Sequence, residues 1–209
     1  MTQPLPAPIK HFILICVFLE FCALTGMVMG FGPTVRNLML LAGGFWPGML
    51  FGGPSLYPGQ PVTMFASSAF LHANLTHLAM NMIGLVWLGP MIVNRLGVQA
   101  FWPIAGLTAI GSGLVFTWLS STMTPMVGAS GVIFGLLGVV AIWDLLDRIR
   151  RRDSLRPLIQ HALVFLALNV ALTLLYPGAI AWQAHLGGLL AGGLCGVLTW
   201  RGRRRSQLL

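Results

Sequence analysis

A serine and a histidine, far apart in the sequence, are the side chains of this chain best suited to chemistry. Ser130 lies in Gly128-Ala129-Ser130-Gly131 at the start of one apolar run, and His185 lies near the start of another. A serine hydroxyl becomes an effective nucleophile when a neighbouring base takes its proton, and neutral histidine does this near pH 7. The pair therefore predicts nucleophilic hydrolysis, provided that the fold brings the two side chains together.

The charged ends of the two runs indicate that both residues lie at one depth. Counting back from Asp147 and Arg201 at about 1.5 Å per helical residue places Ser130 about 25 Å and His185 about 24 Å from the same face. That depth lies within a hydrocarbon core of about 30 Å. The chemistry is therefore expected inside a membrane.

Two further polar residues are predicted to share this level. His77 and Asn81 are four residues apart, so they are neighbours on one helix face, and they lie about 27 Å and 21 Å from Arg95. A tetrahedral intermediate needs hydrogen-bond donors aimed at its oxyanion. The side chains of His77 and Asn81, with the backbone N–H of Ser130 at a helix start, are the expected donors.

Glycines surround these residues in a pattern that favours close approach. Gly128 and Gly131 flank the serine and would let a substrate backbone come near. Gly131 with Gly135, and Gly188 with Gly192, are pairs of small residues four apart, which let helix backbones approach each other in lipid. The helix of the serine and the helix of the histidine are therefore expected to pack together.

Composition explains which elements position these residues. The 209 residues are 56% hydrophobic and only 8% charged, with a mean hydropathy of +0.85, whereas a soluble domain carries about 25% charged residues. We expect a single all-α transmembrane domain over 1–209, a six-helix bundle whose first run is a retained span and not a signal peptide. The predicted spans are 11–30, 71–93, 98–119, 130–147, 159–176 and 181–200.

The net charge of +8 indicates orientation. With six crossings, all but Arg36 of the twelve basic residues fall on one side, which places both termini in the cytoplasm by the positive-inside rule. Anionic lipid headgroups are a sufficient partner for the basic tail, so no nucleic-acid partner is expected. The long segment 31–70, which is apolar and contains Trp46, is expected to lie partly in the outer membrane interface.

The acidic residues exclude a carboxylate triad. Glu20 lies in the middle of the first span, and Asp144, Asp147 and Asp153 lie at the cytoplasmic end. The sequence thus predicts a Ser–His dyad, and neither a metal nor a cofactor is predicted. A metal site at the histidines is disfavoured, because His72 and His77 are five residues apart and no Glu accompanies them as in zinc proteases.

Two alternatives remain beside hydrolysis. A proton-coupled transporter could use Glu20 and the histidines as a relay, although no clear midplane site or broken helix is visible. A catalytically inactive protein that binds membrane helices without cutting them is the other, although this chain keeps both the serine and the histidine.

At these residues the chain resembles the rhomboid family of intramembrane serine proteases, over about 10–209. The family's His-x-x-x-Asn, Gly-x-Ser-Gly and His-x-x-Gly patterns occur in order and on the expected spans, at 77–81, 128–131 and 185–188. The resemblance implies that Ser130 is the nucleophile and His185 the general base, with His77, Asn81 and the Ser130 amide as oxyanion hole. It also implies that Phe134 packs against the histidine.

The resemblance further implies the substrate class and the surroundings of the site. Substrates would be single-pass membrane proteins, cleaved near the outer end of their helix at small residues, and the fifth helix would act as the substrate gate. A bacterial inner membrane is the expected location, and no oligomeric state is implied.

Many rhomboids carry a Trp-Arg pair in the first loop, but here Trp46 precedes Pro47 and Arg36 is the sole loop arginine. For Glu20 we expect a hydrogen bond to a neighbouring helix or loop.

Overall fold

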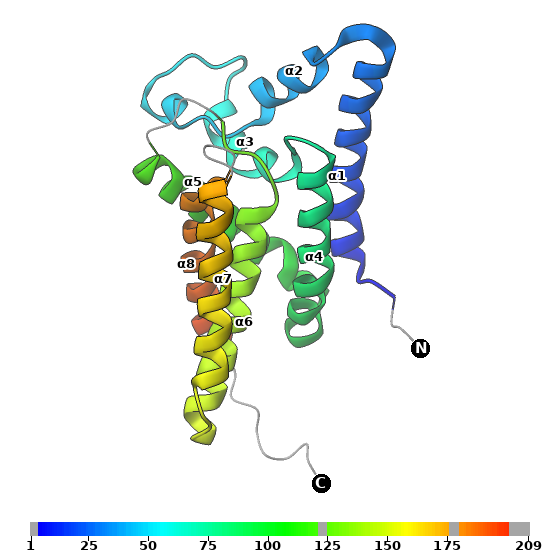
Figure 1. Cartoon of the computed structure of the whole chain (residues 1–209). Coiled ribbons are helices and arrows are strands. Elements are labelled where there is room, and N and C mark those ends of the chain that lie inside the picture. The colour runs from blue at the N-terminus through cyan, green and yellow to red at the C-terminus, as the bar shows by residue number, and fades with distance from the viewer. Residues whose placement is uncertain (1–3, 121–124, 176–179, 201–209) are drawn as a thin grey trace.

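Helices make up most of the computed structural model, which describes residues 4–120, 125–175 and 180–200. Within these residues the only β-type pairing is an isolated bridge between Phe45 and Met126, so the predicted all-α class is confirmed. Each predicted span overlaps one long helix (Figure 1): α1 Ala7–Gly26, α4 Leu75–Leu96, α5 Phe101–Leu119, α6 Ser130–Arg151, α7 Arg156–Leu175 and α8 Trp182–Thr199.

Four helical segments have the length and apolar composition needed to cross a membrane. They are Ala7–Phe31, Leu75–Leu96, Val98–Leu119 and Arg156–Leu175. The helices that carry the serine and the histidine, α6 and α8, are not among them. The last turn of α6 is strongly charged, and α8 contains Gln183, His185 and five glycines. The six membrane crossings therefore stay a prediction.

Capping explains where α4 begins. The predicted span started at residue 71, but the helix starts at Leu75, because the Asn74 side chain accepts a hydrogen bond of 2.8 Å from the His77 N–H. Asparagine is among the preferred N-cap residues, since it satisfies a backbone donor that has no partner within the helix. The cap thus fixes the first turn of α4, which carries His77.

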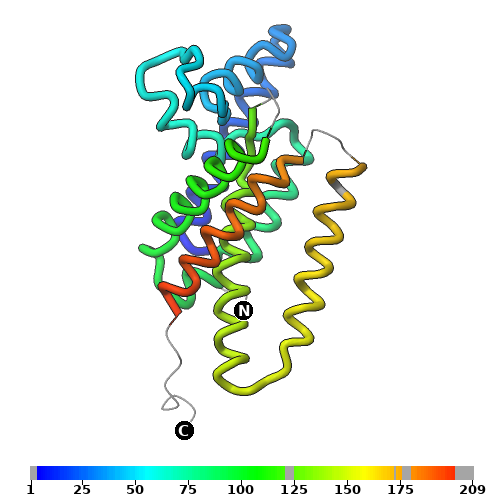
Figure 2. The backbone as a smooth tube through the Cα atoms, turned by 90° about the vertical axis from the view of Figure 1, so that its left-hand side faces the viewer, coloured from blue at the N-terminus to red at the C-terminus, as the bar shows by residue number. Residues whose placement is uncertain are grey.

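The bundle is arranged around α6. This helix packs most extensively against α8, and both contact α5, while α4 packs on another side of α6 and contacts α1. Figure 2 shows α7 at the edge of the bundle, beyond the turn that follows α6. Buried apolar side chains from α1, α4, α5 and α6 form the main core, among them Phe12, Leu85, Ile92, Phe101 and Leu136.

Glycines let α6 and α8 come into backbone contact. A Cβ atom added at Gly188 would overlap the carbonyl oxygen of Gly131, and one added at Gly192 would overlap that of Gly135. Any larger side chain at these positions would force the helices apart. The contact predicted from the small-residue spacing is confirmed, and it sets the separation of the serine and histidine helices.

The segment between α1 and α4 is more ordered than a plain loop. It contains α2 Thr34–Gly43 and α3 Gln60–Ser67, with 3₁₀ turns at Pro47–Phe51 and Ser68–Phe70. Backbone hydrogen bonds of 2.9 and 3.0 Å join Phe45 and Met126, so the segment is tied to the chain that enters α6. It exposes several apolar side chains, including those of Leu38, Phe51, Leu56 and Val62. Its association with the membrane stays a prediction.

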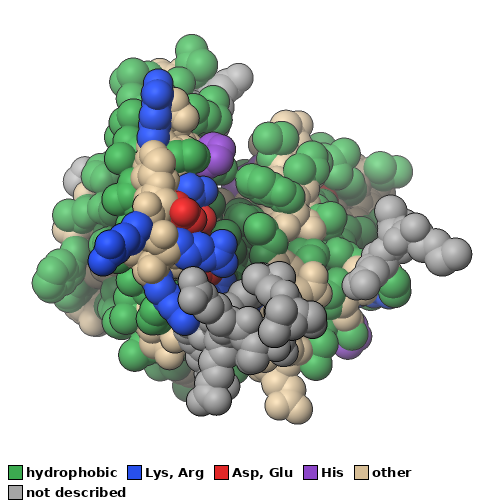
Figure 3. Space-filling model, turned by 90° about the horizontal axis from the view of Figure 1, so that it is seen from below, with side chains coloured by type: hydrophobic (Ala, Val, Ile, Leu, Met, Phe, Trp, Pro, Cys, Tyr) green, Lys and Arg blue, Asp and Glu red, His purple; other side chains and the backbone are tan. Residues whose placement is uncertain are grey.

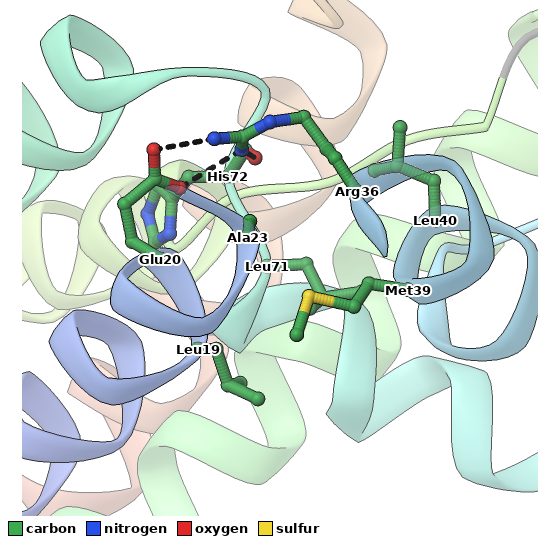
Figure 4. A pocket seen from close by; sticks show the side chains of 8 residues that line it. All are labelled: Leu19, Glu20, Ala23, Arg36, Met39, Leu40, Leu71 and His72. Atoms are coloured by element: carbon green, nitrogen blue, oxygen red, sulfur yellow. Dashed lines mark hydrogen bonds and ion pairs between the residues drawn. The ribbon is translucent and has the colours of Figure 1, made fainter. Parts of the chain in front are cut away.

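A partly buried ion pair attaches this segment to α1 (Figure 4). Arg36 of α2 donates to both carboxylate oxygens of Glu20 at 2.7 and 2.9 Å and to the carbonyl oxygen of His72 at 2.6 Å. The hydrogen bonds to Glu20 raise the pKa of Arg36 above its usual value. The expected hydrogen bond of Glu20 is confirmed, and Arg36 links α1, α2 and the segment that leads into α4.

The opposite end of the bundle is charged. Lys and Arg side chains gather on the face seen in Figure 3. Toward the end of α6, Arg95 pairs with Asp147 at 3.3 Å and Arg148 with Asp144 at 2.8 Å. Basic residues in the last turn of α6 also suit the negative end of its helix dipole. The predicted basic tail, Arg201 and 203–205, lies outside the described residues. The cytoplasmic placement of this face stays a prediction.

Candidate active site

The turn before α6 places Ser130 beside α4. Ser130 is the first residue of α6, and Gly128 two residues earlier has φ +119°, a conformation that favours glycine. The Gly128 N–H donates to the carbonyl oxygen of Ser68 at 2.9 Å. A Cβ atom at Gly128 would lie 2.6 Å from Cε1 and 2.7 Å from Nε2 of His77. Glycine is therefore needed here both for the backbone conformation and for the approach to His77.

Ser130 and His185 are in direct contact. Ser130 Oγ and His185 Nε2 lie 2.9 Å apart, which is a good hydrogen-bond distance. His185 is in the first turn of α8 and is buried, with only 9% of the residue exposed. The backbone contact between α6 and α8 holds the two side chains at this separation.

The remaining contacts of the imidazole fix its orientation. The Phe134 ring, one turn after Ser130, stacks on the His185 ring with centroids 4.2 Å apart and planes 5° apart. On the other side, His185 Nδ1 lies 3.0 Å from Oδ1 of Asn169 on α7. Both nitrogens and one face of the ring therefore have defined partners.

Asn169 was missed by the sequence analysis, although the sequence carried a signal for it. It is the only polar residue in the apolar stretch 162–172. Polar side chains in a membrane span are costly and tend to face the interior of the bundle. The rule therefore singles out Asn169 as a candidate for a contact inside the bundle.

His77 and Asn81 lie next to the turn that carries Ser130. The Asn81 side chain is buried, and its Nδ2 donates to the carbonyl oxygen of His77 at 2.9 Å. Asn81 Nδ2 carries a second N–H that remains available. This nitrogen lies close to Gly128, since a Cβ atom added there would be 3.6 Å from it. The N–H of Ser130, at the first position of a helix, has no acceptor within that helix. Three possible donors thus meet around Gly128 and Ser130.

A small pocket opens beside the serine. It lies between the segment that precedes α4, helix α5 and the start of α6. A Cβ atom at Gly131 would overlap the side chain of Ser112 on α5, so glycine is required for this close packing. The residues that line the pocket include Ser68, Ala109, Ser112, Met126, Ser130 and Ala184.

The other titratable residues lie away from the dyad. His72 precedes α4, with its ring centroid 5.2 Å from that of His77, and burial lowers its pKa to about 4. Glu20 pairs with Arg36, and Asp144 and Asp147 pair with arginines at the charged end. Across residues 4–120, 125–175 and 180–200, no three His, Cys, Asp or Glu side chains are grouped as metal ligands would be. Because these carboxylates are paired elsewhere, the described partner of His185 Nδ1 is the carboxamide of Asn169 and not a carboxylate.

Comparisons with known proteins indicate the family of this chain. The sequence pattern of the rhomboid domain matches residues 59–202, a range that contains all the candidate site residues. The mitochondrial rhomboid protein 1 of Saccharomyces cerevisiae is 32% identical over 138 residues, covering 62% of this chain and 39% of that protein. Two proteins of Toxoplasma gondii also match. Rhomboid-like protease 1 is 32% identical over 148 residues (69% and 49%), and rhomboid-like protease 3 is 28% identical over 169 residues (77% and 57%).

These matches cover only part of the relatives, since the chain spans between 39% and 57% of their lengths. The family match and the apolar helices together identify an integral multi-pass membrane protein. Because the rhomboid domain covers well over half of the sequence, the chain belongs to the rhomboid family.

Proposed function

We propose that this chain is an intramembrane serine endopeptidase that hydrolyses single-pass transmembrane proteins near the external face of the membrane. The observation that carries the proposal is the 2.9 Å separation between Ser130 Oγ and His185 Nε2 at the contact between α6 and α8. Family membership supports it, as do the relatives named rhomboid-like proteases. Ser130 is the nucleophile and His185 the general base.

Acylation begins when Ser130 Oγ attacks the carbonyl carbon of the scissile peptide bond. His185 Nε2 accepts the hydroxyl proton, so the electron pair of the O–H bond becomes available for the new C–O bond. The oxyanion that forms accepts hydrogen bonds from the Ser130 N–H, from the second N–H of Asn81 and from the ring N–H of His77. The Phe134 ring keeps the imidazolium in place while it carries the proton.

Collapse of the tetrahedral intermediate breaks the C–N bond, and the imidazolium gives its proton to the leaving amine. A water molecule then attacks the acyl-enzyme, with His185 again accepting a proton, and the carboxylate product leaves as Ser130 regains its hydrogen. The pocket beside Ser130 adjoins the reacting hydroxyl, and its lining combines serines and alanines with the larger apolar residues Phe65, Met126 and Val132. The small size of the pocket supports cleavage at small substrate residues.

The placement of the site supports the proposed membrane face. Ser130 opens α6, and His185 is in the first turn of α8, whereas the basic and acidic side chains gather at the far end of α6. Under the positive-inside rule the basic end is cytoplasmic. The dyad then faces the external side, where a transmembrane substrate helix ends. Substrates and membrane lipids are the partners in this proposal.

The test is cleavage of a panel of single-span membrane proteins by the purified chain in liposomes. We expect wild type to cut at least one of them near the external end of its span, as mapped by mass spectrometry, and Ser130→Ala to cut none. Cleavage that persists in Ser130→Ala would overturn the proposal. So would an intact panel together with a wild-type protein that an active-site fluorophosphonate fails to label.

A further inference from the structure

Helix α7 contributes a half-buried polar side chain, Asn169, that contacts the dyad. Among the side chains described in α7, those of Phe165, Asn169 and Thr173 are half-buried at steps of four residues, and the other half-buried ones are Pro157 and Leu158 in the first turn. Residues four apart share one helix face, so the stripe of three residues is the face that α7 turns toward the bundle. Asn169 lies in its middle.

The contact between Asn169 and His185 is selective for one atom of each side chain. Oδ1 of Asn169 faces Nδ1 of His185 at 3.0 Å. A carboxamide oxygen is only an acceptor, so Nδ1 must carry the hydrogen of the neutral ring. Nε2 then holds a lone pair, and this is the atom that lies 2.9 Å from Ser130 Oγ. The hydrogen bond therefore selects the tautomer that can accept the serine proton.

From this geometry we infer that Asn169 is a positioning residue, which holds His185 in the orientation and tautomer required of a general base. The inference rests on the proposed function of Ser130 and His185. Asn169 contacts the same imidazole nitrogen, Nδ1, that the carboxylate contacts in a Ser-His-Asp triad. Its side chain is neutral, and it lies on α7, whereas Ser130 lies on α6 and His185 on α8. Asn169 assists the reaction through His185 and does not touch the reacting atoms.

The inference makes the alignment of the base depend on α7. Within the described residues, the Asn169–His185 hydrogen bond is the only one that joins an α7 side chain to another long helix. Contacts between α7 and the rest of the bundle are otherwise few. A displacement of α7 away from α8 would therefore release Nδ1 of His185 while the Ser130–His185 contact between α6 and α8 remained possible.

The test uses two substitutions with opposite effects on the acceptor. Asn169→Leu keeps the side-chain size and suits a lipid-facing helix, but it removes the acceptor. We expect kcat to fall roughly 10- to 100-fold with KM nearly unchanged, because orientation of the base is lost and substrate binding is not. Asn169→Asp keeps the acceptor oxygen and removes the N–H donors, so we expect it to retain most of the activity.

The pH dependence of kcat gives a readout that a purely structural role would not move. In Asn169→Asp a carboxylate beside the ring stabilises the protonated imidazolium, which cannot act as a base, so the acidic limb of the profile moves to higher pH. Among the described residues, His77 on α4 is the titratable side chain that acts on this ring, and it is the same in all variants. Gln160→Ala, which removes an exposed carboxamide from the same helix, is the matched control and should leave kcat and the profile unchanged.

The outcomes separate this inference from the proposed function. Wild-type kcat in Asn169→Leu together with an unshifted profile in Asn169→Asp, with Ser130→Ala inactive, would overturn the inference alone. An inactive Asn169→Asp that is folded by circular dichroism would also overturn it, because Asn169 would then act as a donor and not as an acceptor. Cleavage by Ser130→Ala would remove the proposed function, and the inference with it.

Discussion

Side chains from α6 and α7 hold the imidazole of His185 on both nitrogens and one face. Ser130 meets Nε2, Asn169 meets Nδ1, and Phe134 stacks on the ring. A ring constrained in this way has few other orientations to adopt, so little further ordering is needed when a substrate arrives. Such preorganisation of a base beside its nucleophile is what efficient proton transfer requires.

Asn81 is predicted to stabilise the oxyanion. Asn81→Ala should lower kcat about 100- to 1,000-fold, which is the effect of losing one oxyanion donor elsewhere. The measurement is kcat for cleavage of a single-span substrate in liposomes. Asn94→Ala, which removes an exposed carboxamide near the other end of α4, is the control and should match wild type. An unchanged kcat in Asn81→Ala would exclude it from this role.

Residues of the site were predictable where the sequence placed them in pairs or motifs. His77 and Asn81 are four apart on one helix, and Ser130 and His185 each lie among glycines at one calculated depth. Their spacing in the sequence was therefore enough to predict that these four side chains lie close together. Asn169 has no such companion within its stretch. Its partner is on another helix, and only the three-dimensional arrangement reveals that contact.

At the scale of elements, the separation of α6 and α8 determines whether the dyad can form. Gly188→Ala should place a methyl group against the Gly131 carbonyl and push the helices apart. Overpacking of this kind costs about 1–3 kcal/mol, so we expect a lower Tm and a large loss of cleavage activity. Gly193→Ala is the matched control on the same helix, since its Cβ would meet only Ile142 Cγ1 at an ordinary 3.6 Å. Equal Tm values and activities for the two variants would contradict this account of the helix contact.

The Glu20–Arg36 pair is predicted to hold α2 against α1. Arg36→Ala leaves the carboxyl of Glu20, which is 4% exposed, without its partner, and breaking a buried pair in this way costs about 3–5 kcal/mol. The double variant Glu20→Ala/Arg36→Ala should be less destabilised than the sum of the single variants, as measured by unfolding in detergent. Strictly additive losses would show that the pair contributes no coupling.

The long helices were predictable from sequence and the intervening segment was not. Apolar runs of about 20 residues specify helices almost by themselves, and the ends differ from prediction mainly where a cap acts, as at Asn74. The helices α2 and α3 are short, and their positions depend on distant contacts. Arg36 with Glu20 and Phe45 with Met126 are such contacts, and no periodicity in the sequence indicates them.

At the scale of the whole molecule, charge separates the two ends of the bundle. Lys and Arg side chains gather on one face of the molecule (Figure 3), and the last turn of α6 is basic, whereas Ser130 and His185 lie in the first turns of their helices. Under the positive-inside rule this arrangement predicts one direction of the chain in a membrane. It also keeps the acidic side chains of α6 in ion pairs with Arg95 and Arg148, away from the site.

The orientation is tested by labelling single cysteines in a variant that lacks the native three. Ser55→Cys, on the exposed segment between α1 and α4, should react with a membrane-impermeant maleimide in intact cells. Ser154→Cys, in the exposed turn between α6 and α7, should react only after permeabilisation, because basic loops remain cytoplasmic. The reverse pattern would place the dyad on the cytoplasmic side.

The central claim is that the hydroxyl of Ser130 is made nucleophilic by His185. Its most direct test is to treat the purified protein with a fluorophosphonate and to locate the adduct by peptide mass spectrometry. We predict one adduct on Ser130 in wild type, none in Ser130→Ala, and strongly slowed labelling in His185→Ala. An adduct on another residue, or labelling of His185→Ala at the wild-type rate, would contradict the account.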